Sequence, residues 1–295
     1  MKFKTWINTW PKLVEIEKDN GTLTSPPVSI PYLNKMVNNS KVLIKGCAGA
    51  GDQFISLKWL KELSKNNNKI YYFPNKHNIS NILKRLDYIH YVYDSNYVNF
   101  KQFDYWCLSG DVVYTMNFNS FSDIPKEPHF PITNNKHGNK VGLKLWSNVD
   151  TPKMCNESRQ FSVDYLFDIL YPYRDDYEFY LLDIEQFGYV PNWINKPKLD
   201  YDWNETMSFI SDMDLVISSC TGVAHLSSGM GIKTLIIIPM KHTINNNFWM
   251  WEVENDKDRY GGEYTWFYKN TMLIKQQNQQ DINYMDKIVN YIKEL

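Results

Sequence analysis

The chain has 295 residues and a formal net charge of −1, so it is long enough for two domains and carries no global charge that would direct it to nucleic acid or to a membrane surface. Its 4 cysteines lie far apart, with no CxxC pair and no Cys/His metal spacing, which indicates reduced thiols. No apolar run approaches the ~20 residues of a membrane span, and the N-terminus lacks an apolar signal core. The sequence therefore predicts a cytoplasmic protein without an integral membrane segment.

The first half of the chain alternates short apolar runs with amphipathic stretches. Residues 1–40 are an amphipathic opening that ends in a Pro-containing connector. After it the sequence predicts a strand at 41–45, a glycine turn at 46–52, a helix at about 53–64, a strand at 70–73, a helix at 78–86, and strands at 88–93 and 103–108. This alternation predicts a doubly wound α/β domain at 1–125, with 1–40 as an extension.

A second α/β series follows an Asn-, Pro- and Ser-rich linker at 117–139. The predicted elements are a strand at 141–146, a helix at 163–170, a strand at 177–182, a helix at 203–211, a strand at 215–217, a helix at 223–230, a strand at 234–238, an aromatic and polar loop region at 241–270, and an amphipathic helix at 281–295. We expect a second domain at 140–280, and a C-terminal helix that crosses back to the first domain.

The stretch from Asp212 to Pro239 carries the clearest chemical signal. Its first strand is followed by a small-residue turn that holds Ser219, Cys220, Thr221 and Gly222, and a short helix begins there. Such a turn brings hydroxyls and backbone N–H groups to a helix N-terminus, where the helix dipole favours an anion such as phosphate. Simple capping of the helix by Ser219 or Thr221 is an alternative that is compatible with this role.

Several segments, in the same order along 41–295, resemble glycosyltransferases of the ADP-heptose:LPS heptosyltransferase family and their tetratricopeptide-associated relatives. The matching segments are GCAGAGDQFISLKWLKEL, VGLKLWSN, SRQFSVDYLFDIL, DLVISSCTGVAHLSSGMGIKTLIIIP, FWMWEV and YTWFYKNTMLIKQ. The resemblance implies a GT-B fold, in which two Rossmann-like domains face each other across a cleft. It also implies transfer of a sugar from a nucleotide-sugar donor to an acceptor hydroxyl. If one base acts in a direct displacement, the anomeric carbon is inverted, and we expect neither an essential metal nor another cofactor.

In the first domain the resemblance implies that Asp52 is the general base that deprotonates the acceptor. A carboxylate just after a glycine turn, at a helix start, can project into a cleft and act in this way. The alternative interpretation is an acidic residue in the first turn that complements the helix dipole.

In the second domain the resemblance carries Thr221, Gly222 and His225 over to donor binding. Cys220 departs from the pattern, because many relatives carry an Asp there that holds the donor ribose, and a cysteine cannot accept two ribose hydroxyls as a carboxylate does. For His225, a hydrogen-bonded structural role is the alternative.

Residues at the end of the strand at 141–146 occupy a cleft position, because ligands of such sheets bind at the carboxyl ends of strands. We expect Ser147 and Asn148 to contact the donor there. Lys144 is a candidate cation for the diphosphate leaving group, although its facing is open, and Arg159 is a candidate second cation or a surface residue.

An aromatic cluster and a set of paired acids complete the candidates. Trp249 and Trp251, with Trp266 and Tyr268, either stack on a sugar or base or pack the hinge. The Asp-x-Asp pairs at 200/202, 212/214 and 256/258 are interpreted as solvated turn acids, since a hard cation needs several converging oxygens.

The acceptor is left undetermined among a glycan, a lipid-linked molecule and a nucleic acid. The composition, rich in Lys, Asn, Ile and Tyr, suits a bacteriophage or an AT-rich bacterium, so glycosylation of DNA bases is one alternative. That alternative needs a basic acceptor face, for which the candidates are Lys58, Lys61, Lys65, Lys69 and Lys76. A non-catalytic nucleotide-sugar-binding module, favoured by Cys220, is another alternative.

Overall fold

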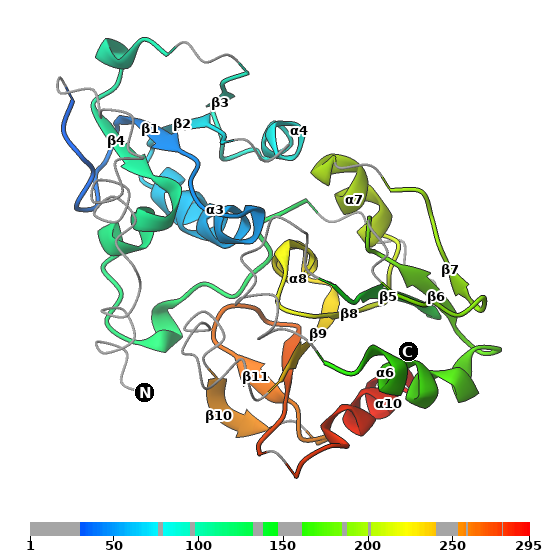
Figure 1. Ribbon diagram of the computed structural model, residues 1–295. Helices are drawn as coiled ribbons and strands as arrows, with labels where there is room; N and C mark the ends of the chain where they lie inside the picture. Colours follow the sequence, from blue (N-terminus) through cyan, green and yellow to red (C-terminus); the bar gives the residue numbers. More distant parts are fainter. Residues whose placement is uncertain are drawn as a thin grey trace. The chain divides into compact units, whose positions relative to one another are not determined.

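The computed structural model describes residues 30–75, 79–94, 98–131, 138–146, 161–184, 188–199, 202–239, 253–257, 259–278 and 280–295 (Figure 1). These residues form two compact units. The first contains the described residues up to Ile124, with His129–Pro131 and Asp202–Asn204, and the second contains Pro125–Pro128 and the described residues from 138 to 199 and from Glu205 to Leu295.

The first unit is built on a parallel sheet with the strand order β3-β2-β1-β4. Its elements are β1 Lys41–Lys45, α3 Ala50–Ser64, β2 Lys69–Phe73, α4 Ser80–Leu83, β3 Tyr91–Val92, η1 Phe100–Gln102, β4 Tyr105–Leu108, η2 Ser109–Thr115 and η3 Phe121–Asp123. The apolar residues at helical spacing in α3 are buried, as the pattern predicts: Phe54, Leu57, Leu60 and Leu63. The apolar centre of β1 is buried as well, which is typical of a parallel strand covered on both faces.

The second unit is built on an eight-stranded sheet with the order β10-β11-β12-β9-β8-β5-β6-β7. Its elements are β5 Lys140–Lys144, α6 Val163–Leu170, η4 Tyr171–Tyr173, β6 Glu178–Leu181, β7 Ile194–Asn195, α7 Trp203–Ile210, β8 Leu215–Ser218, α8 Gly222–Gly229, β9 Lys233–Ile238, β10 Val253–Lys257, β11 Glu263–Thr265, β12 Thr271–Lys275, η6 Tyr284–Asp286 and α10 Lys287–Ile292. The strands from β12 to β7 are parallel, and β10 and β11 extend the sheet in antiparallel fashion. In Figure 1, α6 and α10 cover one face of this sheet, and α7 and α8 lie on the other.

Two expectations about the second unit are wrong. The sequence predicts a loop region over 241–270, yet this stretch contains β10 and β11, which are short antiparallel strands without a clear alternation of apolar residues. The C-terminal helix is expected to return to the first domain. Instead Ile288 and Ile292 of α10 belong to the same hydrophobic core as Leu143 and Leu166 of the second unit, because this face of the sheet needs a second helix beside α6.

In both sheets the strand order reverses at the first strand, because the next strand is added on one side of it and a later strand on the other side. In the second unit β5 pairs with β6 on one side and with β8 on the other, and in the first unit β1 lies between β2 and β4 in the same way. Open parallel sheets bind ligands at the carboxyl ends of strands at such a switch point. The topology therefore predicts that ligands bind at the segments that follow β5 and β8, and at those that follow β1 and β4.

No helix in the part of the chain that the structure describes has the length and apolarity that a membrane span requires.

Candidate functional site

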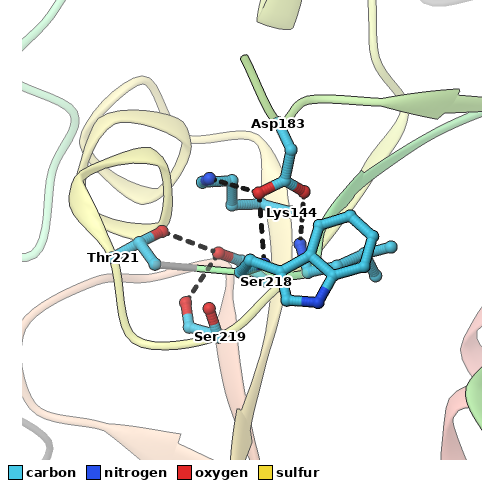
Figure 2. Close-up of polar contacts among 7 residues, drawn as sticks. Lys144, Asp183, Ser218, Ser219 and Thr221 are labelled. Atoms are coloured by element: carbon cyan, nitrogen blue, oxygen red, sulfur yellow. Dashed lines mark hydrogen bonds and ion pairs between the residues drawn. The ribbon is translucent and has the colours of Figure 1, made fainter. Parts of the chain in front are cut away.

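The switch point of the second unit holds a buried ion pair between Lys144, the last residue of β5, and Asp183, which follows β6 (Figure 2). The Lys144 and Asp183 side chains are 8% and 1% exposed. The Asp183 carboxylate also accepts hydrogen bonds from the backbone N–H groups of Leu145 at 2.7 Å and Trp146 at 3.1 Å. Burial raises the pKa of Asp183, while Lys144 and the two N–H groups oppose this shift. The pair thus fixes the backbone where β5 ends.

The turn after β8 lies against the same place. The Ser219 N–H donates to the Lys144 carbonyl oxygen at 3.0 Å. The Ser218 hydroxyl donates to the Ser219 carbonyl at 2.6 Å and lies 3.2 Å from the Thr221 hydroxyl (Figure 2). These contacts join the β5 and β8 ends into one polar structure that brings Lys144, Ser219 and Thr221 together.

The N-terminus of α8 opens at this turn. Thr221 is the N-cap residue, with an extended backbone, and its side chain makes no capping hydrogen bond. The first turn of an α-helix leaves N–H groups without intrahelical acceptors. The Ser219 hydroxyl beside it is buried and has no hydrogen-bond partner among the described residues. A buried, unsatisfied hydroxyl next to such N–H groups is suited to an anionic oxygen ligand.

His225 lies inside α8 and faces the protein core. Its Nδ1 is hydrogen-bonded to the buried Tyr268 hydroxyl at 3.0 Å, and its side chain is also buried. Burial, and secondarily the nearby Cys220, raises the pKa of Tyr268, so this hydroxyl stays protonated. The structure therefore supports the hydrogen-bonded structural role for His225, which braces α8 against Tyr268 (the bracing role). It places Tyr268 in the core and not on an open stacking surface.

The switch point of the first unit is a strained glycine turn held by polar side chains. A Cβ on Gly46 would lie 2.4 Å from the Gln53 Oε1 and 3.0 Å from the Asn75 backbone nitrogen, so a side chain at position 46 would force these neighbours to shift. Ala48 adopts a left-handed φ of 57°, and the Asn75 amide donates to its carbonyl at 2.8 Å. On the other side, the Ser109 hydroxyl accepts from the Cys47 N–H at 3.2 Å. A strained backbone that its neighbours hold in place is common at functional sites.

Asp52 is the third residue of α3, immediately after this turn. Its Oδ2 accepts a hydrogen bond from the Gly49 N–H at 3.1 Å, which closes a capping box at the helix start. The side chain is half-buried. The capping alternative is thus realised in the structure, and it leaves the catalytic role of Asp52 a prediction.

Several predicted residues lie outside the described part of the chain: Ser147, Asn148, Arg159, Trp249, Trp251 and Lys76. Of the other stacking candidates, Trp266 is described, and the Lys126 ammonium lies 5.2 Å from the centre of its ring.

The proposed basic face of the first unit is incomplete. Lys58 is only 1% exposed, so the expectation that it contributes to a nucleic-acid surface is wrong, because α3 buries that side of its helix. Lys65 is paired with Glu62 at 2.7 Å. Lys61, Lys65 and Lys69 line a depression together with Asp87. Since Lys69 begins β2, this depression lies near the end of the sheet opposite to the glycine turn.

Within the described ranges, no group of three or more His, Cys, Asp or Glu side chains converges. Asp214, a member of one of the Asp-x-Asp pairs, accepts hydrogen bonds from the backbone N–H groups of Asn139 at 3.1 Å and Lys140 at 3.0 Å. It thereby orders the start of β5.

Sequence reasoning missed Asp183 as the partner of Lys144, and it missed the contact of Tyr268 with His225. Asp183 follows the predicted strand at 177–182, so the rule that singled out Lys144 at a strand end applies equally to it. For Tyr268 no local signal exists, since it meets His225 across 43 positions of sequence.

No protein-family model matches the sequence, and no curated protein matches it. Solved structures do match in fold. One is a glycosyl transferase family 9 protein from Veillonella parvula, with a TM-score of 0.53, 9% identity, and coverage of 85% of this chain and 90% of that chain. Two more are from E. coli, heptosyltransferase WaaC with ADP-2-deoxy-2-fluoro heptose and ADP-heptose LPS heptosyltransferase II. Each has a TM-score of 0.53, 9% identity, and coverage of 86% of this chain and 99% of the other. The chain therefore has the GT-B fold of these glycosyltransferases, with two Rossmann-like domains, as the sequence resemblance predicted.

Proposed function

We propose that the protein is a glycosyltransferase that moves a sugar from a nucleotide-sugar donor to an acceptor hydroxyl. The observation that carries the proposal is the turn after β8, where the buried Ser219 hydroxyl has no partner within the described residues and the N-terminus of α8 begins. The solved structures of the same fold are glycosyltransferases, and one of them was determined with a nucleotide-sugar analogue.

The donor diphosphate would bind at the N-terminus of α8. Its oxygens accept hydrogen bonds from the N–H groups of the first helical turn and from the hydroxyls of Ser219 and Thr221. Lys144 lies beneath this turn, and Asp183 balances its charge and holds the β5 end in position. Gly222, as the first residue of α8, lets the diphosphate approach the backbone closely.

The ribose contact is the part of the site that differs from the family pattern. Cys220 is buried, and it lies where a carboxylate would hold two ribose hydroxyls. A thiol is a weak donor and acceptor. We therefore expect the nucleotide to be held mainly through its diphosphate, with Ser147 and Asn148 as additional donor contacts.

The reaction would be a direct displacement at the anomeric carbon. The acceptor oxygen forms the new bond, the bond from the anomeric carbon to the diphosphate oxygen breaks, and the acceptor proton passes to the Asp52 carboxylate. One displacement inverts the configuration of the anomeric carbon. The N-terminal dipole of α8 and the hydroxyls of Ser219 and Thr221 stabilise the negative charge that develops on the leaving group.

The donor preference is tested by calorimetric titration of the full chain with ADP-, UDP-, GDP- and CMP-sugars. Ser219→Ala is the test variant, and Ser211→Ala is the matched control, because the Ser211 hydroxyl donates to the Ser208 carbonyl at the end of α7, away from the turn. We expect one nucleotide class to bind wild type and the control alike, and to bind Ser219→Ala about tenfold more weakly. Equal binding by all three proteins, or no binding by any of them, would contradict the proposal.

A further inference from the structure

The second unit carries a surface depression that the donor site does not use. It encloses about 410 Å³ of space and lies between α6 and the segment that leads into the edge strand β7. Its lining includes the side chains Asp164, Asp168, Tyr171, Tyr189, Asn192 and Trp193. A volume of this size falls within the roughly 300–1,000 Å³ of pockets that hold small organic ligands.

The rings of this depression are unusually open to solvent. Tyr189 is 74% exposed and Tyr171 is 50% exposed. Trp193 is held from behind, because its ring packs edge-on against Phe179 at 5.3 Å and Phe167 at 6.3 Å between centroids. A ring fixed in this way loses little conformational entropy when a ligand covers it, so Trp193 is prepared for binding.

Polar side chains border the rings. Asp164 and Asp168 are exposed and four residues apart in α6, so they lie on one face of the helix, and Asn192 is exposed on the opposite segment. Within the described residues, none of these three side chains takes part in a hydrogen bond or an ion pair. Their oxygen atoms are acceptors, and the Asn192 amide is a donor as well.

Open rings bordered by carboxylate and amide groups suit a ligand that is apolar on its faces and hydroxylated at its edges. We propose that this depression binds a saccharide, whose C–H face stacks on Tyr189 and Trp193 while its hydroxyls donate to Asp164 and Asp168. This site is separate from the donor turn, and it does not depend on the proposed transferase activity.

An organic cation is the competing ligand for rings and carboxylates. Two features disfavour it. The Arg174 guanidinium already lies 4.0 Å from the centre of the Tyr171 ring, and the Lys196 ammonium donates to the Val190 carbonyl at 3.0 Å, so positive charge is present nearby. A methylated ammonium group is also much smaller than the depression.

The test is saturation-transfer NMR on the full chain with maltotriose, cellotriose and chitotriose as probes. Tyr189→Ala and Asp168→Ala change exposed side chains of the depression, and Tyr91→Ala, which is 53% exposed in the first unit, is the matched control. We expect at least one trisaccharide to bind wild type and the control equally, and to bind each test variant about two- to tenfold more weakly.

Three results would overturn the proposal. They are failure of all three trisaccharides to bind, binding that neither test variant weakens, and displacement of the bound trisaccharide by ADP, which would assign the signal to the donor site. Tetramethylammonium chloride is titrated in parallel. Its binding in place of the saccharides, with loss in the same two variants, would show a cation site instead.

Discussion

Replacing Asp183, whose carboxylate balances the charge of Lys144, by Asn should destabilise the second unit strongly. The two side chains of the pair are 8% and 1% exposed, so solvent cannot replace Asp183 when it is changed to Asn. Removal of one partner of a buried ion pair costs about 3–5 kcal/mol. At roughly 2–4 °C per kcal/mol for a domain of 150–250 residues, Asp183→Asn should lower the melting temperature by about 6–20 °C.

The double variant Lys144→Met/Asp183→Asn separates the charge from the rest of the interaction. It leaves no unpaired charge, and the side-chain amide oxygen introduced at position 183 can still accept one of the two N–H groups of Leu145 and Trp146. We therefore expect it to be more stable than Asp183→Asn by about 2 kcal/mol, with the remaining loss of about 1–3 kcal/mol caused by the second N–H group.

The assay is thermal and urea unfolding followed by circular dichroism, with coincident probes as the check for a two-state transition. Asp175→Asn is the control, since the Asp175 side chain is 80% exposed and should change the melting temperature little. An Asp183→Asn protein that melts with the wild type, or a double variant no more stable than the single one, would refute the assignment of a buried, mutually dependent pair.

The same pair predicts a pH dependence with a definite sign. Burial raises the pKa of Asp183, so between its unfolded value of about 3.9 and its higher folded value the native state binds more protons than the unfolded state. The free energy of unfolding contributed by this group is therefore largest below the unfolded pKa and decreases as pH rises through that window. In Asp183→Asn this component should be absent from the pH profile of stability, and an unchanged profile would contradict it.

Three further predictions concern the two turns. Ser219→Ala should change the free energy of unfolding by less than about 0.5 kcal/mol, because the hydroxyl has no partner among the described residues; a larger loss in urea unfolding would show a hidden structural bond. Asp52→Asn retains an acceptor for the Gly49 N–H, so it should unfold like wild type while sugar transfer, measured by release of the nucleoside diphosphate, falls at least about 100-fold. Asp52→Ala should in addition lower the free energy of unfolding by about 1 kcal/mol, because the helix cap is lost. If Asp52→Asn turned over substrate like wild type, Asp52 would be a helix-capping residue without a catalytic role. Tyr268→Phe leaves the buried His225 Nδ1 without its hydroxyl partner and should cost about 1–3 kcal/mol, so an unchanged melting temperature would rule out the bracing role.

The elements that sequence reasoning located best are those with a complete local signal. The helix predicted at 163–170 is α6 with the same bounds, and the predicted strand, turn, helix and strand between 212 and 239 are β8, α8 and β9 to within a residue or two. In each, an apolar run or a helical spacing coincides with a small-residue turn. Strands β10 and β11 lack such a pattern, because their stability comes from the pairing of β10 with β11 and of β11 with β12, which local sequence does not encode.

By itself the sequence determined the two α/β series, the small-residue turn before α8 and the glycine turn before α3, because periodicity, small residues and glycine act over a few positions. Only the tertiary structure decided which partners these turns have. Parallel pairing of β5 with β6 brings Asp183 to Lys144 across 39 positions, and packing of the segment after β11 brings Tyr268 to His225. The tertiary structure also decided where α10 packs. Its apolar stripe shows that one face of the helix is buried, but this stripe is equally compatible with the core of the first unit and that of the second. Its location follows from the uncovered face of the second sheet beside α6, a property of the assembled layer and not of any short segment.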